Sequence, residues 1–319
     1  MSRSSKLKPL FGININPNAG GVQLAIDLAR FADQSAIDLI GIQDHPYNGG
    51  FLETWTLLSA LGAVTSNVRL FPNVADLPLR PPAMLAKAAA TLDIITNGRV
   101  ELGLGAGAFW KGISSYDGPQ RSPGEAVQAL EEAIQVMRLI WDSQGNGRPV
   151  SFAGRFYRLV EAQPGPRPPH LIGIWLGALK PRMLRLVGRL ADGWSVSLSY
   201  VLPEQIPGMQ QLIDEAAVEA NREPSSIRRN YNLGGMILSA SQSNLRARRP
   251  GMLFGLPTVW VETLVRFYTE LGMDTFHFWP VAGNEQEQIR LFAEEVVPAA
   301  REQIVSTLGS EGTPDSSSM

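Results

Sequence analysis

Short apolar runs alternate with amphipathic helical stretches along almost the whole chain, and this alternation restricts the fold more than any other feature. Eight predicted strands cover residues 10–16, 39–45, 68–75, 99–107, 171–177, 193–199, 231–240 and 275–281. Eight predicted helices follow them, over residues 22–35, 53–66, 81–96, 124–142, 181–192, 204–222, 258–272 and 285–305. Such a repeat is typical of a (β/α)8 TIM barrel. The alternative is an open, doubly wound sheet, which rarely needs so many units.

Two irregular stretches interrupt the alternation. Residues 144–169 are rich in Gly, Pro and Arg and predict an insertion with two short strands, and residues 241–257 predict an irregular loop. With 319 residues, 44% of them hydrophobic, the chain has enough apolar material for one large core. We therefore expect a single domain over residues 1–308, followed by a small, polar and disordered tail over residues 309–319.

Composition argues against several classes of function. The net charge of −2 gives no electrostatic reason to expect nucleic acid or a membrane surface as a partner. The chain has no cysteine and only three histidines, far apart in sequence, so we predict neither disulfides nor a bound metal. The N-terminus lacks the apolar stretch of a secretory signal, and no segment reaches the ~18 apolar residues of a membrane span. We therefore expect a cytoplasmic protein.

Polar residues gather where the predicted strands end, which is the face that carries the active site in this kind of barrel. Asp44 and His45 end the second strand, and His45 is the histidine best placed to give or take a proton near neutral pH. The alternative interpretation is that Asp44 caps the loop and His45 is merely exposed. His170 precedes the fifth strand and belongs to the opposite face, and His277 lies inside the eighth strand and is expected in the core.

The segment VELGLGAGAFWKG, residues 100–112, ends the fourth strand with three glycines at alternate positions. Alternate residues of a strand lie on one side, so Gly103, Gly105 and Gly107 leave that side of the backbone open to a large flat group. The alternative is that they only permit a bend. A dinucleotide fingerprint does not fit, because the next predicted helix begins only ~15 residues later. Trp110 follows the glycines, and we expect it to cover a bound ring or the substrate.

Two further segments suit a flat ligand that carries a phosphate. LGALKPR, residues 176–182, places a glycine before a helix N-terminus, where free backbone N–H groups can bind a phosphate. Residues 73–76 end the third strand before a proline-rich turn, where a bulge or an unusual peptide geometry is expected. A phosphate site beside a flat pocket indicates a flavin-type cofactor.

These segments, together with IDLIGIQDH, TLDIITNGR and GRLADGWSVS, resemble the bacterial luciferase-like flavin monooxygenase superfamily. The resemblance spans about residues 10–300. The Asp-His pair and the helix before the glycines look most like the branch that uses the deazaflavin coenzyme F420. The resemblance therefore implies coenzyme F420 as the cofactor, with FMN as the alternative, because FMN-using members share the pattern.

The resemblance also implies a role for individual residues. Asp44 and His45 match a pair beside the ring, in which the histidine serves protonation, and Asn73-Val74 matches a non-prolyl cis peptide that backs the ring. The residues implied in cofactor binding are Asp44, Asn73, Val74, Ala75, Gly105, Ala106, Gly107, Gly177, Ala178, Leu179, Lys180 and Arg182. We predict catalysis by His45, Asp44 and Trp110, with Asp44 orienting or tuning His45.

We therefore expect an oxidoreductase that transfers a hydride between coenzyme F420 and a small organic substrate. Some deazaflavin dehydrogenases carry an acidic residue directly after the last glycine of the motif, where this chain has Ala108, so an apolar or aromatic substrate is expected. One alternative is an FMN-dependent monooxygenase that is supplied by a flavin reductase. Another is a non-catalytic flavin-binding protein. Members of the family are often dimers, which implies a homodimer.

Overall fold

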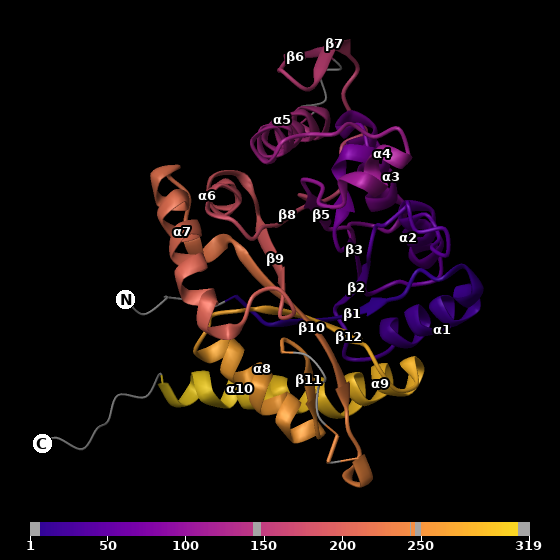
Figure 1. The fold of residues 1–319 in the computed structure, drawn as a ribbon, viewed down its shortest axis with the longest axis vertical. Coiled ribbons are helices and arrows are strands. Elements are labelled where there is room, and N and C mark those ends of the chain that lie inside the picture. Colours follow the sequence, from indigo (N-terminus) through magenta and orange to yellow (C-terminus); the bar gives the residue numbers. More distant parts are fainter. Residues whose placement is uncertain (1–6, 143–147, 243, 246–249, 312–319) are drawn as a thin grey trace, which may run out of the picture.

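The computed structural model describes residues 7–142, 148–242, 244–245 and 250–311, which form a barrel of parallel strands surrounded by helices (Figure 1). The barrel strands are β1 (Leu10–Ile15), β2 (Leu39–Ile42), β3 (Arg69–Pro72), β4 (Ala75–Asp76), β5 (Leu102–Gly105), β8 (Ile174–Gly177), β9 (Gly193–Ser197), β10 (Arg228–Ile237) and β12 (Thr275–Pro280). They follow the order β3-β2-β1-β12-β10-β9-β8-β5-β4, and neighbours run parallel. The predicted (β/α)8 barrel is confirmed.

The third predicted strand is split, and the split closes the barrel. Strand β3 pairs with β2 on one side, whereas β4 pairs with β5 on the other. Below the split, Leu70 bridges to Val100: the Leu70 N–H donates to the Arg99 carbonyl (2.7 Å), and the Glu101 N–H donates to the Leu70 carbonyl (3.0 Å). The third strand therefore joins both of its neighbours: β3 pairs with β2 and bridges to Val100, and β4 pairs with β5.

Helices cover the outside of the barrel in the predicted order (Figure 1). They are α1 (Val22–Asp33), α2 (Thr54–Ala63), α3 (Pro82–Ile95), α5 (Pro123–Trp141), α6 (Pro181–Leu190), α7 (Ile206–Glu219), α8 (Pro257–Thr269), α9 (Glu285–Leu291) and α10 (Val297–Glu311). Local signals set their starts: Ser122 and Glu125 form a capping box at the start of α5, and Pro123 occupies its first position. Among the described residues, no helix combines the length and apolar character needed to cross a membrane.

Both irregular stretches lie where the sequence predicts them. The insertion forms the antiparallel pair β6 (Val150–Ala153) and β7 (Arg158–Ala162), which projects beyond α5 in Figure 1. In the second stretch, β11 (Leu253–Gly255) adds to β10, and residues 243 and 246–249 lie outside the described part. Helix α10 continues to Glu311, past the predicted domain end at 308, and residues 312–319 of the predicted tail are not described.

The amino-terminal half of the barrel interior is filled with large side chains. Leu10, Leu39, Phe71 and Trp175 form a separate buried cluster there. The Phe71 ring lies 4.9 Å from the Trp175 ring and 5.4 Å from the His277 ring. His277 is fully buried, as predicted, and burial lowers its pKa to about 3, so its imidazole is neutral. This plug fills the barrel interior at the amino-terminal end, so a ligand that enters the barrel is expected at the carboxyl ends of the strands.

Glycine at position 188 lets α6 and α7 pack closely. A Cβ atom added at Gly188 would lie 2.2 Å from the Ile213 carbonyl oxygen. We expect Gly188→Ala to lower the free energy of unfolding by about 1–3 kcal/mol, because the two helices must separate. The matched control is Gly208→Ala in α7, where an added Cβ meets nothing within 4 Å. That variant should be stabilised by about 0.5–1 kcal/mol, and urea unfolding measures both.

Candidate functional site

A layer of amide and hydroxyl side chains crosses the barrel interior above the apolar plug. Asn73 Nδ2 donates to the Oδ1 atoms of Asn14 (3.1 Å) and Asn232 (2.6 Å). Asn73 Oδ1 accepts from Ser195 Oγ (3.2 Å), which in turn accepts from Asn230 Nδ2 (2.8 Å). The layer thus links residues of β1, β9 and β10 with the end of β3 and forms a polar floor at the carboxyl ends of the strands.

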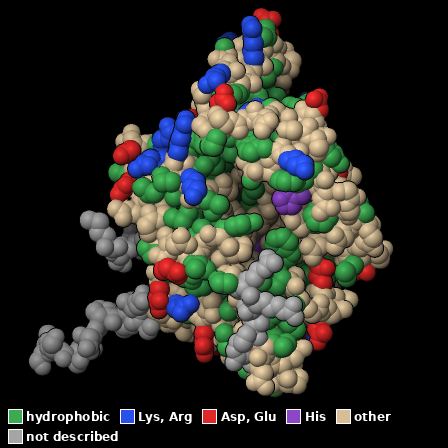
Figure 2. Space-filling model, viewed as in Figure 1, with side chains coloured by type: hydrophobic (Ala, Val, Ile, Leu, Met, Phe, Trp, Pro, Cys, Tyr) green, Lys and Arg blue, Asp and Glu red, His purple; other side chains and the backbone are tan. Residues whose placement is uncertain are grey.

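A small cavity of about 40 Å³ lies on this floor. It is lined by Asn14, Ile15, Gln43, Asn73, Ser197, Asn232 and Trp279. Its amide groups offer both hydrogen-bond donors and acceptors to the edge of a bound ring. Figure 2 shows a hollow near the middle of the molecule, with hydrophobic side chains around it and a histidine at its rim.

Val74 lies against the glycines that follow β5 and β8. The peptide bond between Asn73 and Val74 is cis, as the resemblance implied. A Cβ atom added at Gly103, Gly105 or Gly177 would lie 2.9, 3.1 or 3.4 Å from a methyl group of Val74. Val74 therefore occupies the side of Gly103 and Gly105 that we expected to stay open for a flat ring. The apolar surface that a ring can meet here belongs to Val74.

The third glycine of the motif has a different role. Gly107 has a φ of +93°, which glycine adopts without strain, and an added Cβ would lie 2.9 Å from the Trp110 ring and 2.7 Å from Pro78. Trp110 begins the short helix α4 (Trp110–Ser115), which the sequence did not predict. Its ring packs over Gly107 and is half-buried, whereas the neighbouring Phe109 is 53% exposed. The role of Trp110 in covering a bound ring or the substrate stays a prediction.

Asp44 is held by an arginine that the sequence analysis did not single out. Arg80 contacts it twice, from Nε to Oδ2 (2.7 Å) and from Nη2 to Oδ1 (2.8 Å), and also contacts Glu53 (2.5 Å). Burial works to lower the pKa of Arg80, but its hydrogen bonds and ion pairs with Asp44 and Glu53 raise it overall. Asp44 is 2% exposed, so this is a buried ion pair at the end of β2.

His45 contacts Tyr47, and Asp44, which was expected to orient or tune it, acts on it through its charge. His45 Nδ1 lies 2.9 Å from the Tyr47 hydroxyl, whose ring is 5.2 Å from that of Phe109. Burial, with the charges of Asp76 and Asp44, raises the pKa of Tyr47 to about 12, so the hydroxyl stays protonated. Desolvation lowers the pKa of His45 and outweighs the opposing charge of Asp44, so the imidazole is mostly neutral at pH 7.

Asp76 is a second buried carboxyl beside Asp44. Its backbone N–H donates to Asp44 Oδ2 (2.9 Å), and its side chain is almost wholly buried. Among the described residues, no hydrogen-bond partner reaches its Oδ1 atom. Burial and the charge of Asp44, opposed by Arg80, raise the pKa of Asp76 to about 7. An acid that titrates near neutrality therefore ends β4.

The predicted phosphate segment joins β8 to α6. Lys180 precedes the helix in an extended conformation and caps it with no side-chain bond, so the first-turn N–H groups are left for another acceptor. Leu179 is 46% exposed and Lys180 is also exposed. Ala178 differs, because it is buried and its carbonyl accepts from Trp194 Nε1 (2.9 Å). Its direct contact with a cofactor stays a prediction, like the binding roles of Ala75 and Ala106.

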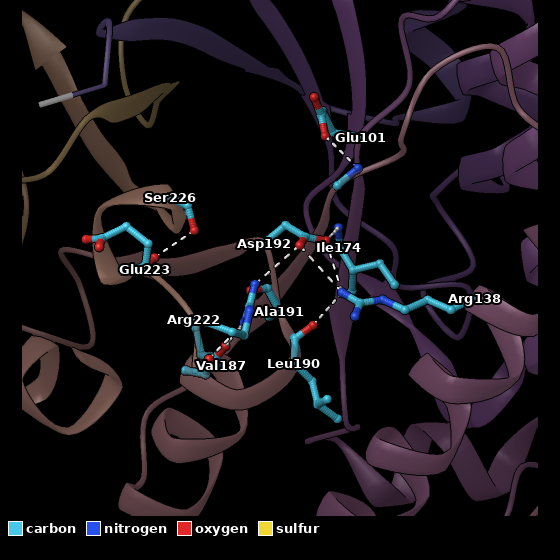
Figure 3. Close-up of polar contacts among 12 residues, drawn as sticks. Glu101, Arg138, Ile174, Val187, Leu190, Ala191, Asp192, Arg222, Glu223 and Ser226 are labelled. Carbon is cyan, nitrogen blue, oxygen red and sulfur yellow. Dashed lines mark hydrogen bonds and ion pairs between the residues drawn. The ribbon is translucent and has the colours of Figure 1, made fainter. Parts of the chain in front are cut away.

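At the amino-terminal end of the barrel, polar side chains make structural contacts, as the position of His170 before the fifth predicted strand indicated. His170 Nδ1 lies 2.8 Å from the buried Asp93. A cavity of about 810 Å³ lies there, and two of the arginines that line it are engaged: Arg138 donates to the Leu190 carbonyl (2.6 Å) and Arg222 to the Ala191 carbonyl (2.7 Å). Figure 3 shows both arginines directed at Asp192 at the end of α6. Within the described residues, no group of three or more histidine or acidic side chains could hold a metal.

Comparison with known proteins identifies the family. The family model of the luciferase-like monooxygenases matches residues 10–302. The chain belongs to this family. Among curated proteins, this luciferase-like chain is 36% identical over 179 residues to the phthiodiolone/phenolphthiodiolone dimycocerosates ketoreductase of Mycobacterium tuberculosis. That match covers 55% of this chain but only 45% of the ketoreductase, so the chain spans less than half of that relative's length.

A second relative and two solved structures extend the comparison. The F420-dependent glucose-6-phosphate dehydrogenase of Nocardia farcinica is 29% identical over 227 residues, which are 68% of this chain and 66% of that protein. An F420-dependent secondary alcohol dehydrogenase superposes with a TM-score of 0.81 at 20% identity, covering 92% of this chain and 99% of that one. The long-chain alkane monooxygenase LadA superposes with a TM-score of 0.78 at 12% identity, covering 94% of this chain and 92% of that one. At these identities, the two structures establish the shared fold alone.

The buried ion pair gives a prediction for Arg80. We expect Arg80→Gln to lower the free energy of unfolding by about 3–5 kcal/mol, because it leaves the Asp44 carboxylate buried without its cation. The control is Arg290→Gln, which removes an exposed pair with Glu294 and should change stability by less than about 0.5 kcal/mol. Urea unfolding of both variants checks this. Equal losses in the two would mean that the Arg80 pair is no stronger than a surface contact.

Proposed function

We propose that this luciferase-like protein is an F420-dependent oxidoreductase that interconverts a ketone and a secondary alcohol on an apolar substrate. The observation that carries the proposal is the His45–Tyr47 pair on the loop after β2, close in the chain to Gln43, which lines the cavity. The names of its relatives favour this chemistry, since they include a ketoreductase and an F420-dependent dehydrogenase. One structural neighbour is an F420-dependent secondary alcohol dehydrogenase bound to an F420-acetone adduct.

The residues of the site fit a flat cofactor with a phosphate tail. The amide layer around Asn73 offers donors and acceptors to the polar edge of a ring, and Val74 offers an apolar face. The first turn of α6, after Lys180, presents backbone N–H groups to an anion. Coenzyme F420, when bound, supplies a carbon that donates or accepts a hydride. The chain's own task is to orient the substrate and to move the proton that accompanies the hydride.

His45 moves that proton. An alcohol that loses a hydride from carbon must also lose a proton from oxygen, and the neutral imidazole accepts it at Nε2 while its Nδ1–H donates to the Tyr47 hydroxyl oxygen. In the reverse direction, the imidazolium returns the proton to the ketone oxygen. The lowered pKa of His45, caused by desolvation, keeps the imidazole neutral and ready to accept at pH 7.

The rim favours an apolar substrate. Tyr47 and Phe109 meet edge to face with their ring centroids 5.2 Å apart, and the Trp110 ring packs over Gly107. Ala108 adds no charge to this wall. Asp44 is engaged with Arg80, so its proposed role is to fix the loop that carries His45. The predicted homodimer is part of the same proposal.

FMN is the alternative cofactor, because the same amide layer and helix N-terminus also suit its ring and phosphate. Monooxygenases such as LadA share the fold. An FMN-dependent monooxygenase would need a flavin reductase as a partner, and a non-catalytic flavin-binding protein would need neither reductase nor His45.

Binding of the two cofactors separates these functions. We expect the purified protein to bind coenzyme F420 with a micromolar or lower Kd and to bind FMN at least tenfold more weakly. Fluorescence titration of both ligands side by side measures this. Tight binding of FMN alone would favour the monooxygenase, and binding of neither would exclude both cofactors.

The proton-transfer role of His45 gives a second prediction. His45→Gln should lower kcat by about 10²- to 10⁴-fold, because it removes the group that accepts the proton. The Kd for coenzyme F420 should change less than threefold, which is the control for folding. Tyr47→Phe should keep most of the activity but shift its pH profile, since it removes only the partner of Nδ1. Unchanged turnover in His45→Gln would indicate a flavin-binding protein or a different acid–base residue.

A further inference from the structure

The cavity at the amino-terminal end of the barrel has no role in the function proposed above. Its volume of about 810 Å³ lies within the range of pockets that hold small organic molecules, roughly 300–1,000 Å³. Its walls are the carboxyl end of α5, residues 167–172, which lead into β8, and the segments that follow α6 and α7. It shares no lining residue with the small cavity at the carboxyl ends of the strands, so the two cavities are separate.

Two arginines in the wall of this cavity share a single carboxylate. Arg138 of α5 and Arg222 after α7 approach Asp192 at 3.4 and 3.5 Å, and their guanidinium groups converge on it in Figure 3. The backbone N–H of Ile174 also donates to Asp192, at 2.9 Å. Burial, with the charge of Arg138 and against that of Asp192, lowers the pKa of Arg222. One carboxylate between two guanidinium groups leaves this part of the wall positive.

Arg167 adds a cation without a counter-ion. It is exposed, and within the part of the chain that the structure describes its side chain makes no hydrogen bond or ion pair. Nearby in the chain, His170 Nδ1 lies 2.8 Å from Asp93, and among the described residues no partner reaches its buried Nε2. The hydrogen bond with Asp93 raises the pKa of His170, which favours an imidazolium with an Nε2–H donor. The other acid of the wall, Asp142, is exposed at the end of α5.

The remainder of the wall is largely apolar. Trp141 is buried, and its Nε1 donates to the Ala86 carbonyl (2.8 Å), which anchors the indole. Leu171 is 87% exposed. Single exposed leucines are common on protein surfaces, but this one lines the same cavity as Trp141 and Ile172. A ligand with an apolar body would remove Leu171 from water.

We propose that this cavity binds an amphipathic organic anion. Its acidic head group pairs with Arg167, the cation for which the described chain supplies no partner, and accepts a hydrogen bond from His170 Nε2–H. A carboxylate or a phosphate ester has the oxygens for both contacts. The apolar body of the ligand lies along Trp141 and Leu171, where the hydrophobic effect favours its burial. This binding is independent of the cofactor and of the proposed function.

Calorimetric titration with decanoate and with decyl phosphate tests the proposal, with decanamide as the uncharged control. We expect the wild-type protein to bind at least one of the two anions with a millimolar or lower Kd. Decanamide should bind about tenfold more weakly, because it cannot form the charge-assisted contacts. The anion with the lower Kd identifies the head group.

Substitutions at exposed positions locate the bound anion. Arg167→Gln should raise its Kd about tenfold, because it removes the unpaired cation. The matched control is Arg158→Gln, which removes an exposed arginine of β7 that does not line the cavity and should change the Kd less than about twofold. Leu171→Ser should raise the Kd about threefold through lost apolar contact, and Val160→Ser on β7 is its control.

Three results would overturn the inference. They are binding of neither anion, equal binding of decanamide and decanoate, and an unchanged Kd in Arg167→Gln, which would place the bound anion elsewhere. The Kd for coenzyme F420 should be the same in the wild type and in Arg167→Gln. Failure of the inference therefore leaves the proposed function intact, whereas a wild-type protein that binds decanoate but not coenzyme F420 would overturn the proposed function alone.

Discussion

The hydrogen bonds of Asn73 are the contacts on which the geometry of the barrel mouth depends. Its Nδ2 atom bonds to Asn14 and Asn232 and its Oδ1 atom to Ser195, so one amide ties the end of β3 to three other strands. Those contacts turn Asn73 toward the barrel interior at the point where β3 stops and β4 has not yet begun. Val74 is thereby set against the glycines, and the amide of Asp76 reaches Asp44.

The second constraint is electrostatic. Removing Asp44 and Arg80 from water is costly, and the pair is tolerated because both contacts of the guanidinium are short and well directed. Because these contacts depend on short distances, the ion pair holds the loop after β2 close to the turn after β4. His45 and Tyr47 lie on that loop, so the position of the proposed proton-transfer pair is fixed by an ion pair that takes no part in the transfer.

Sequence patterns predicted the scaffold better than the site. The period of apolar residues marks strands and helices locally, and the rule that strands present their carboxyl ends at one face located Asp44 and His45. The pairing of Asp44 with Arg80 joins residues 36 positions apart, and no local pattern reports it. The contact of Val74 with glycines of β5 and β8 could not be predicted from the sequence either. A glycine shows that space is available, but it does not identify the residue that fills that space. Helix α4 was not predicted, because its six residues are too few to show the apolar periodicity of a helix.

The glycine motif of β5 is not followed by an acidic residue, whereas the neighbouring strand β4 ends in one, Asp76. The pairing of β4 with β5 connects these two positions. Ala108 stands where the family resemblance led us to look for an acidic side chain, three residues after Gly105. Asp76 is paired in register with that same Gly105, so it lies beside the glycine motif on the neighbouring strand. An acid placed there is buried beside Asp44, whereas one after the glycines would stand in the exposed turn with Ala108 and Phe109. Burial beside Asp44 raises the pKa of Asp76 to about 7, and the exposed turn carries no charge at Ala108 or Phe109.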